Sequence, residues 1–504
     1  MMEKEIKLTE DQEEAMKLLK SGKNIFVTGE AGTGKSTLIN EYIKYLEENK
    51  IEHVVCAPTG IAAINVGGAT LHRTFGAPIG YISEDECNKR KAENEVIRNA
   101  KVIIIDEISM CRWDLFDYVT SCINQMCRGE GWCSGKQIVV VGDFLQLPPV
   151  ISGKEKQFFA GTGGFAFEGR TWKKCRFRTV YLHRIVRQSD ESFIRALNQA
   201  RIGDPECISY FNMRVSPYEK DAITLCAKNA TADAINNQRL YEQPGREKCY
   251  TATFKGDAKK SDFNGTEELR LKEGARVMAI ANDVKEERYA NGSMGTVTDM
   301  SDEGVEVEWD NGFTSFVKEN KWDKKKYEVS EQTVTEQVYN KKTGEIEEKS
   351  KKKKVIDTEV TGEIRQIPLR LGYAITIHKS QGNTFDALNV DLSEVFQEGQ
   401  AYVAISRCSN PAGLHLKKAI WPAVFMPVDT VNAFYNECEA EEHRIRQAEA
   451  KAKAIREAAR NGIKAECAVA VDKETADLIS TNAQALGMNS SEYIRRLVHD
   501  HCGN

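Results

Sequence analysis

The sequence predicts an α/β fold with a parallel β-sheet, and three observations support this prediction. Four short apolar runs have the character of buried strands, at 24–28, 53–57, 101–105 and 136–141. The runs lead into turns with glycine or proline and then into stretches with helical character. Because parallel strands need a long crossover connection, this alternation indicates βαβ units. The third observation is a glycine-rich turn at 29–36, placed between the first strand and its helix.

The composition is that of a soluble globular protein with several domains. The chain has 504 residues, of which 41% are hydrophobic and 29% are charged, so a sizeable core is available and wholesale disorder is excluded. At roughly 100–200 residues per domain, the length indicates about three or four domains. No apolar run approaches the roughly 18 residues of a membrane helix, so we expect no membrane contact. The net charge of −5 excludes a bulk polycation, and any nucleic-acid contact must come from a local groove.

The cysteines and the N-terminus bear on location. The N-terminus has no apolar signal-peptide core, and the 14 cysteines are scattered. Free thiols in a reducing cytoplasm are the simplest interpretation, so we expect a cytoplasmic protein. The tightest group is Cys122, Cys127 and Cys133. Its spacing is too loose for a zinc site and no histidine lies nearby, so we expect no metal there.

A second α/β segment begins near residue 185, with strands expected at 222–227 and 387–392. Between them, from about 271 to 363, short β-like runs alternate with glycine turns. This texture indicates a small β-barrel inserted into the second segment. Lys349 and Lys351 to Lys354 form a basic run within it, which is either a solvated hairpin tip or a phosphate contact.

The chain after about 437 is rich in alanine and charge and is expected to be helical up to a stop at Asn461-Gly462. Apolar residues on this helix are spaced three and four apart, as in a coiled-coil seam of about two heptads. The seam consists of Ile445, Ala448, Ala452, Ile455 and Ala459.

The glycine-rich turn matches the pattern G-x-x-x-x-G-K-[ST], which binds nucleotide phosphates. The segment reads GEAGTGKS and has the required context, because it follows a strand and opens a helix. Glycines let backbone N–H groups curl around phosphate oxygens, and the helix N-terminus adds the positive end of its dipole. Lys35 is expected to bridge the β- and γ-phosphates, and the Ser36 hydroxyl is expected to bind Mg²⁺.

Polar residues after neighbouring strands would complete a hydrolytic site. Asp106 and Glu107 end the strand at 101–105, so they face the same crevice as the phosphate loop. Asp106 is expected to hold Mg²⁺ and Glu107 to polarise the attacking water, although an acidic pair here could also be a helix cap. Gln146, after the strand at 136–141, either senses the γ-phosphate or fixes its loop.

These residues resemble the motifs of superfamily 1 helicases, and specifically the Pif family (petite integration frequency) in subclass 1B, beside RecD and Dda. The resemblance covers about residues 5–435, and the motifs occur in the family order. They are LTEDQ (8–12), GEAGTGKST (29–37), APTGIAA (57–63), GATLHRTF (68–75), DEIS (106–109), GDFLQLPPV (142–150), VRQ (186–188), LGYAITIHKSQGNTFD (371–386) and AYVAISR (401–407). The segment NGSMGTV (291–297) also resembles the SH3-like insertion of this group.

The resemblance implies two RecA-like P-loop domains with insertions and a C-terminal appendage. The expected divisions are domain 1A at 1–184 with a small 1B insertion at about 76–95, domain 2A at 185–270 and 364–436, an SH3-like β-barrel 2B at 271–363, a helical linker at 437–464 and a ribbon-helix-helix-like module at 465–504.

The resemblance also implies the site. ATP and Mg²⁺ are the expected cofactors, with Gln12 reading adenine, and Arg187 and Arg407 reaching from 2A to the γ-phosphate. The remaining nucleotide contacts are expected from Gly29, Ala31, Gly32, Thr33, Gly34, Lys35, Ser36, Thr37, Asp106 and Gly382. The family's single-strand contacts match Pro58, Thr59, His72, Phe75, Thr376, His378, Lys379 and Ser380. Hydroxyls and backbone N–H groups would grip phosphates, and His72 and Phe75 would offer faces for base stacking.

The implied function is an ATP-dependent DNA helicase that moves 5′ to 3′ on single-stranded DNA and unwinds tailed or forked duplexes. The polarity comes from the subclass alone. The segment at 76–95, where the family often places a strand-splitting wedge, is short and polar, so no wedge residue is assigned. A translocase that strips bound proteins and an ATP-switched DNA-binding regulator remain as alternatives. Unusual cysteines at 110–135 and the lack of a recognised eukaryotic signature favour a bacterial or phage-type protein.

The last module resembles ribbon-helix-helix proteins of the Arc and MetJ type, which are dimers. The expected strand, ECAVAVD, places Glu466, Ala468 and Ala470 on its outer face, where they supply no donors for base edges. Between 466 and 500 there are three basic and six acidic side chains, which disfavours DNA binding. We therefore expect this tail to dimerise or to dock a protein partner.

Overall fold

The computed structural model describes residues 8–59, 62–63, 66–89, 94–127, 131–133, 135–153, 155–220, 222–263, 265–283, 286, 288–289, 291–339, 346–426, 428–460, 479–480, 482, 488 and 493–494. Side chains are not described at 261, 325–358 or 455–460. The chain divides into two units, Met1–Cys438 and Glu439–Asn504. Among the described residues, no helix is both long enough and apolar enough to cross a membrane.

A six-stranded, fully parallel sheet forms the centre of what we call the first domain. The four strands expected from the sequence are confirmed, and a short strand lies at one edge and a sixth strand at the other. In spatial order the strands are β3 (Ala69–Thr70), β2 (His53–Ala57), β4 (Val102–Ile105), β5 (Gln137–Val141), β1 (Ile25–Gly29) and β6 (Arg178–Leu182). The central strands are buried throughout, because helices cover both faces.

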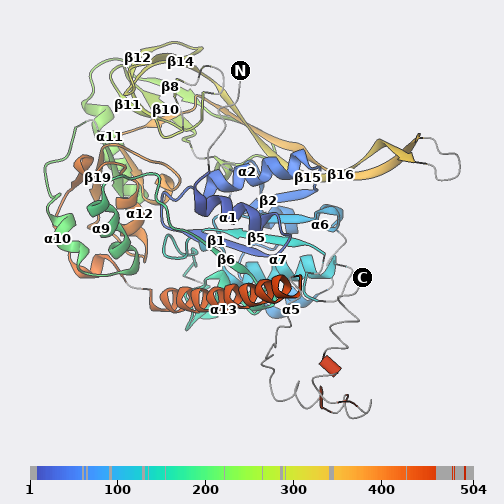
Figure 1. The fold of residues 1–504 in the computed structure, drawn as a ribbon. Coiled ribbons are helices and arrows are strands. Elements are labelled where there is room, and N and C mark those ends of the chain that lie inside the picture. Colours follow the sequence, from blue (N-terminus) through green and yellow to red (C-terminus); the bar gives the residue numbers. More distant parts are fainter. Residues whose placement is uncertain are drawn as a thin grey trace. The chain divides into compact units, whose positions relative to one another are not determined.

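Helices α1 (Glu10–Leu19) and α2 (Lys35–Glu48) lie on one face of this sheet, and α7 (Trp113–Gln125) lies on the other (Figure 1). Helix α1 starts with a capping box between Thr9 and Gln12. Shorter helices fill the connections, and one of them, α5, lies in the segment expected as an insertion. These helices are α4 (Leu71–Phe75), α5 (Glu84–Asn88), α6 (Glu95–Asn99) and α8 (Trp172–Cys175).

The second domain is built on a smaller sheet that is also fully parallel. Both expected strands, β7 (Ile223–Cys226) and β19 (Leu388–Asp391), are confirmed at its centre, between β18 (Ala374–Thr376) and β20 (Leu414–Leu416). Its helices are α9 (Glu191–Ile202), α10 (Cys207–Asn212), α11 (Asn229–Glu242) and α12 (Gln400–Ser406). Short 3₁₀ turns follow the strands, including η5 (His378–Ser380).

The segment between the strands of the second domain forms antiparallel sheets. Five strands build the inserted sheet around a core that includes the buried Trp309, and β17 carries this sheet beyond residue 363. In spatial order they are β14 (Thr314–Lys318), β13 (Gly304–Trp309), β12 (Met294–Met300), β11 (Arg276–Ala279) and β17 (Leu369–Leu371). A separate pair consists of β8 (Lys248–Thr251) and β10 (Glu268–Leu271).

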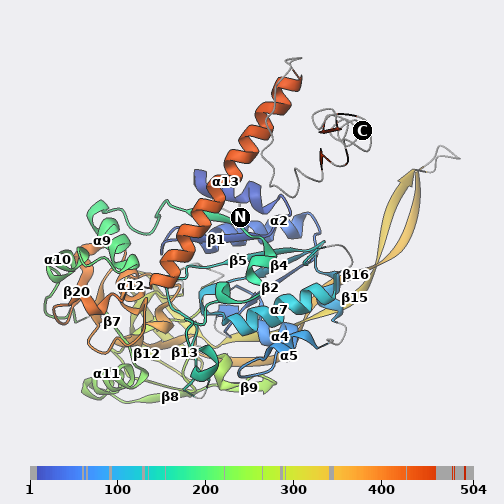
Figure 2. The same ribbon diagram turned by 90° about the horizontal axis from the view of Figure 1, so that it is seen from below.

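A long hairpin, which we call the arm, projects from this region (Figures 1 and 2). It consists of β15 (Asn320–Tyr339) and β16 (Ile346–Gln366), and β9 (Thr253–Gly256) pairs with its base. The basic run that contains Lys349 lies inside β16 and not in the turn of the hairpin. The basic run was expected at the tip of a hairpin, and it lies instead within a strand, close to the turn of the hairpin.

The helix expected after 437 begins earlier, because α13 spans Asp429–Arg460. Its first turns carry Val431 and Tyr435, which are buried in the apolar core of the first domain together with residues from α7 and β5. The apolar side chains at these positions account for the early start, since they have a surface to pack against. The expected ribbon-helix-helix module at 465–504 lies almost entirely outside the described residues.

Candidate active site

A cavity of about 280 Å³ lies between the first and second domains. The first domain contributes the phosphate loop and the ends of β4 and β5, and the second domain contributes residues near α9, η5 and α12. The lining residues are Ala31, Gly32, Gly34, Lys35, Ser36, Thr37, Asp106, Glu107, Gly142, Asp143, Gln146, Val186, Arg187, Gln381, Gly382 and Arg407. All five residues expected to catalyse hydrolysis therefore face one space, although they are up to 372 positions apart in the sequence, from Lys35 to Arg407.

The phosphate loop takes its shape from glycines where other residues do not fit. Gly34 has a φ of 78° and caps the start of α2, and a Cβ atom at Gly29 would lie 2.3 Å from the Leu182 carbonyl oxygen. Lys35 is partly buried, and its Nζ donates hydrogen bonds to the carbonyls of Gly29 at 2.8 Å and Glu30 at 2.9 Å. Burial lowers the pKa of Lys35, while Asp143 and Glu107 oppose this shift.

Gln12, Gly29 and Thr33 do not line the cavity, although they were expected to contact nucleotide. The Gln12 side chain instead braces the loop from behind, because its Nε2 donates to the Thr33 carbonyl at 3.1 Å. Its Oε1 accepts a hydrogen bond from the Thr9 backbone N–H at 3.0 Å. The amide thus connects the N-terminus of α1 to the phosphate loop.

The acidic pair lies where β4 ends. The Asp106 carboxylate accepts a hydrogen bond from the Glu107 N–H at 2.8 Å, and Gln381 of the second domain donates to the Glu107 carboxylate at 2.8 Å. Burial and the neighbouring Asp106 raise the pKa of Glu107 to about 7. Glu107 has a φ of 50° and its side chain caps no helix, so the alternative helix-cap role is not used. Left-handed backbone at a non-glycine residue is a strained arrangement that is often found at active sites.

Two arginines enter the cavity from the side of the second domain. Arg187 Nη1 donates to the Ser406 carbonyl at 3.2 Å, and Arg407 donates to the Val403 carbonyl and the Ser406 hydroxyl, each at 3.0 Å. Burial, and then the charge of Arg187, lowers the pKa of Arg407 to about 9. Among the described residues, no carboxylate accepts a hydrogen bond from either guanidinium. Arg407 is buried and Arg187 is partly buried. Two such cations, with no carboxylate bonded directly to them, make this surface suited to an anion such as phosphate.

Several residues at this site were missed by the sequence analysis. Tyr402 of α12 accepts a hydrogen bond through its hydroxyl from the Ala31 N–H of the phosphate loop, at 2.9 Å. Asp143 and Gln381 line the cavity beside Gln146 and Gly382. All three missed residues lie inside motifs that the sequence analysis had identified, so their position within those motifs could have marked them as candidates. Their partners are in the other domain, and spacing along the chain does not reveal such contacts.

Comparison with known proteins gives consistent matches. Residues 7–204 match the family described as PIF1-like helicase. An ATP-dependent DNA helicase Pif1 from Bdellovibrio bacteriovorus is 32% identical over 429 residues, which cover 82% of this chain and 88% of the relative. The chain belongs to the PIF1-like helicase family.

The eukaryotic relatives of this PIF1-like helicase are longer. The chain spans 66% of the PIF1 of Xenopus laevis at 30% identity, and 61% of that of Danio rerio at 31% identity, where the matches cover 87% and 81% of this chain. A solved structure of Pif1 from a Bacteroides species with ADP-AlF4 matches with a TM-score of 0.72 and 32% identity, over 87% of this chain and 98% of that one. The same relative bound to single-stranded DNA matches with a TM-score of 0.59. This likeness fits a RecA-like helicase fold.

A second cavity of about 490 Å³ in this PIF1-like helicase lies between the first domain and the base of the arm. It contains one expected strand contact, His72, beside Thr70, Arg73 and Ile79, and faces Trp322 and Lys324 of the arm. Arg73 forms an ion pair with Asp257 at 2.9 Å and a hydrogen bond with Thr361. Lys324 forms an ion pair with Asp262 at 2.8 Å. The cations of this groove are therefore engaged by aspartates of the segment after β9.

The other expected strand contacts differ in exposure. Phe75 is only 5% exposed and belongs to the core of the first domain, so the expectation that it offers a stacking face is corrected. Thr376 and Ser380 are also buried, and the Ser380 hydroxyl donates to the Ile377 carbonyl at 2.7 Å. The partly exposed expected contacts are Pro58, Thr59, His72, His378 and Lys379.

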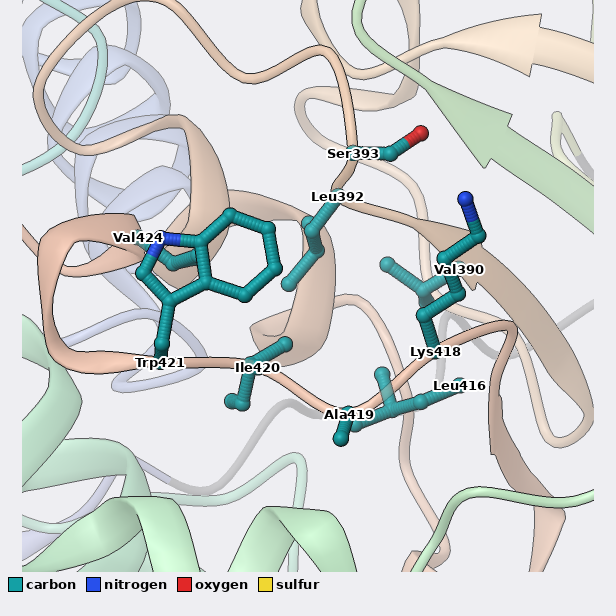
Figure 3. A pocket seen from close by; sticks show the side chains of 9 residues that line it. All are labelled: Val390, Leu392, Ser393, Leu416, Lys418, Ala419, Ile420, Trp421 and Val424. Carbon is teal, nitrogen blue, oxygen red and sulfur yellow. The ribbon is translucent and has the colours of Figure 1, made fainter.

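Arg370, in β17 close to Lys379, was not expected. Its guanidinium is buried, its pKa is lowered to about 10 by burial, and its Nε and Nη1 have no hydrogen-bond partner among the described residues. The charge of Arg370 also lowers the pKa of Lys379, so the two cations share one environment. A third pocket, beneath Trp421 at the end of β20, has a volume of only about 10 Å³ and is too small for more than a water molecule (Figure 3).

Proposed function

We propose that this chain is an ATP-dependent DNA helicase that moves 5′ to 3′ along single-stranded DNA and separates duplex DNA ahead of it. One observation carries the proposal: a single cavity joins the phosphate loop and Glu107 of the first domain to Arg187 and Arg407 of the second. Hydrolysis in such a cavity depends on the distance between the domains, so it can drive their relative motion. The direction of movement rests on the resemblance to subclass 1B.

The residues have separable roles in hydrolysis. Lys35 and the loop N–H groups hold the phosphates, and Glu107 in its ionised form orients and polarises the attacking water. Gln146 contacts the γ-phosphate, while Arg187 and Arg407 stabilise the charge that develops in the transition state. Tyr402 holds the phosphate loop against α12, since its hydroxyl lies 2.9 Å from the Ala31 nitrogen. Gln12, which packs behind the loop, would contact adenine at the rim of the site.

The residues present suit a magnesium ion. Ser36 and Asp106 line the same cavity and offer a hydroxyl and a carboxylate oxygen, which are the hard oxygen ligands that Mg²⁺ prefers. No group of three or more His, Cys, Asp or Glu residues among those described could hold a metal alone, so nucleotide phosphates and water would supply the other ligands. Bound there, Mg²⁺ would neutralise phosphate charge.

The strand is proposed to run over the ends of both sheets. Support comes from the groove beside His72 and from the buried Arg370 near Lys379, whose Nε and Nη1 have no hydrogen-bond partner among the described residues. The solved relatives from Bacteroides include complexes described as bound to single-stranded DNA, and one described as two coordinating Pif1 helicases at forked duplex DNA. We therefore propose single strands and forked or tailed duplexes as the substrates of this chain.

The finer domain divisions are part of this proposal. We assign the inserted sheet and the arm to an SH3-like 2B region and the segment that carries α5 to a 1B insertion. The tail after Cys438 is proposed to dimerise the protein or to dock a partner. Sedimentation of the full chain beside a shortened chain that ends near residue 436 tests the dimerisation. A full-length monomer at micromolar concentration would contradict dimerisation and leave partner docking as the role of the tail.

The decisive experiment measures ATP hydrolysis with and without single-stranded DNA, together with unwinding of duplexes that carry a 5′ or a 3′ tail. Strong stimulation with unwinding from the 5′ tail alone is expected, and Lys35→Ala should abolish both. Stimulation without unwinding would favour a translocase that strips proteins. Stable DNA binding without stimulated hydrolysis would favour an ATP-switched regulator.

A further inference from the structure

A buried carboxylate beside the nucleotide cavity connects three parts of the chain. Asp143 follows β5, and its Oδ1 accepts hydrogen bonds from Arg201 Nη2 at 2.8 Å and from the Tyr435 hydroxyl at 3.1 Å. Its Oδ2 accepts from Arg201 Nε at 3.0 Å and from Gln146 Nε2 at 3.4 Å. Arg201 belongs to α9 of the second domain and Tyr435 to α13. None of the sequence motifs singled out Arg201 or Tyr435.

The Tyr435 hydroxyl is held on several sides. Besides donating to Asp143, it accepts a hydrogen bond from the Phe144 N–H at 2.9 Å and lies 3.0 Å from the Thr28 hydroxyl. The ring stacks near Phe26, and the Arg201 guanidinium carbon lies 5.4 Å from its centre. This one hydroxyl therefore contacts β1, just before the phosphate loop, and the segment that carries Gln146.

We propose that Tyr435 is a positioning residue for ATP hydrolysis, which acts by fixing Asp143 and thereby the amide of Gln146. The inference rests on the proposed hydrolysis of ATP in this cavity. Asp143 and Gln146 both line the cavity, and the Gln146 N–H also donates to the Asp143 carbonyl at 2.9 Å. Without the tyrosine hydroxyl, the carboxylate loses a donor and the Phe144 N–H loses its acceptor. The Gln146 loop would then relax, because buried polar groups move to recover lost partners.

The competing explanation is that Tyr435 only anchors α13. Anchoring by neighbouring groups is substantial, since Phe434 stacks on Phe167 at 4.1 Å and the Tyr181 hydroxyl donates to the Tyr435 carbonyl at 3.3 Å. Tyr181→Phe is therefore a matched control. It removes a hydroxyl that also binds Tyr435, but this hydroxyl is not bonded to Asp143.

The test compares Tyr435→Phe with Tyr181→Phe in the full-length protein, by steady-state ATP hydrolysis with saturating single-stranded DNA. Tyr435→Phe should lower kcat about tenfold and leave KM for ATP within about twofold, because binding by the phosphate loop is untouched. Tyr181→Phe should change neither value by more than about twofold. Arg201→Lys keeps the charge but loses the two-point grip on Asp143, and it should also lower kcat at constant KM. Melting temperatures identify any variant that fails to fold.

A double-mutant cycle distinguishes positioning from general damage. If Tyr435 acts through Gln146, adding Tyr435→Phe to Gln146→Ala should lower kcat by less than about twofold further. Independent, multiplied effects would overturn the proposal, as would normal kcat values in both Tyr435→Phe and Arg201→Lys. Wild-type protein without strand-stimulated hydrolysis would instead overturn the proposed function. An active wild type with equal kcat in the two tyrosine variants would overturn only the positioning role.

Discussion

Replacing Arg407 with alanine tests the division of the catalytic site between two domains. Arg407 is 2% exposed, and its pKa of about 9 compares with an ordinary value of 12.5. At 1.36 kcal/mol per pH unit, the surroundings disfavour the cation by an amount on the order of 5 kcal/mol. An anion that forms beside it relieves this penalty, so part of the energy is available to the transition state. We expect kcat to fall about 10³-fold, equivalent to about 4 kcal/mol.

The assay pairs turnover with binding. Strand-stimulated hydrolysis gives kcat, and titration with a fluorescent ATP analogue gives the dissociation constant. That constant should change by less than about threefold, because Lys35 and the loop remain and the repulsion on Arg187 is removed. Arg407→Lys should recover only part of kcat, since a lysine lacks the planar fork of donors. Hydrolysis by Arg407→Ala at a normal rate would show that Arg407 takes no part in the chemistry and would contradict the catalytic site proposed between the two domains.

Three further predictions follow from the same geometry. Glu107 has a raised pKa of about 7, so it is protonated and inactive as a base at lower pH. The wild-type kcat should therefore rise between about pH 6 and 8, and Glu107→Gln should remove that rise. A wild-type kcat that falls over this range would contradict the role of Glu107 as the base. Phe75→Ala should lower the free energy of unfolding by about 3–5 kcal/mol. His72→Ala should instead weaken single-strand binding about fivefold or more at unchanged melting temperature. If Phe75→Ala weakened strand binding without loss of stability while His72→Ala lowered stability, Phe75 and not His72 would contact the strand. Asp257→Asn should free Arg73 and tighten single-strand binding about two- to fivefold at low salt. Asp302→Asn, which breaks an ion pair with Lys248 away from the groove, should leave strand binding unchanged. Equal effects of the two variants would show that Asp257 does not compete with the strand for Arg73.

Much of the first domain could be predicted because its strands are buried on both faces. Continuous apolar runs such as those of β4 and β5 have few alternatives. The two-residue strand β3 and the partly polar β6 were missed, since neither carries such a run. The sequence analysis assigned the arm to a barrel, because the alternation of β-like runs and glycine turns does not indicate how long a hairpin is.

The sequence predicted those parts of the nucleotide site that consist of a short continuous segment with a recognisable pattern. The phosphate loop and Asp106 follow from local patterns, and the structure places them together. Arg201 and Tyr402 could not be found in this way, because their partners Asp143 and Ala31 lie in the other domain. The error at Phe75 has a different cause: an aromatic residue near a strand track can serve either the groove or the core, and only burial distinguishes the two.

The early start of α13 has a consequence for how this protein is made. The core of the first domain includes Val428, Val431 and Tyr435, which are synthesised only after the whole second domain, the inserted sheet and the arm. During synthesis, the part of the aromatic surface around Phe26 and Phe144 that Phe434 and Tyr435 cover therefore stays exposed while more than two hundred further residues are made. A fragment that ends near residue 184 would keep this surface exposed and should aggregate. The first domain is thus finished last, and a ribosome that stalls late leaves the domain that carries the phosphate loop incomplete.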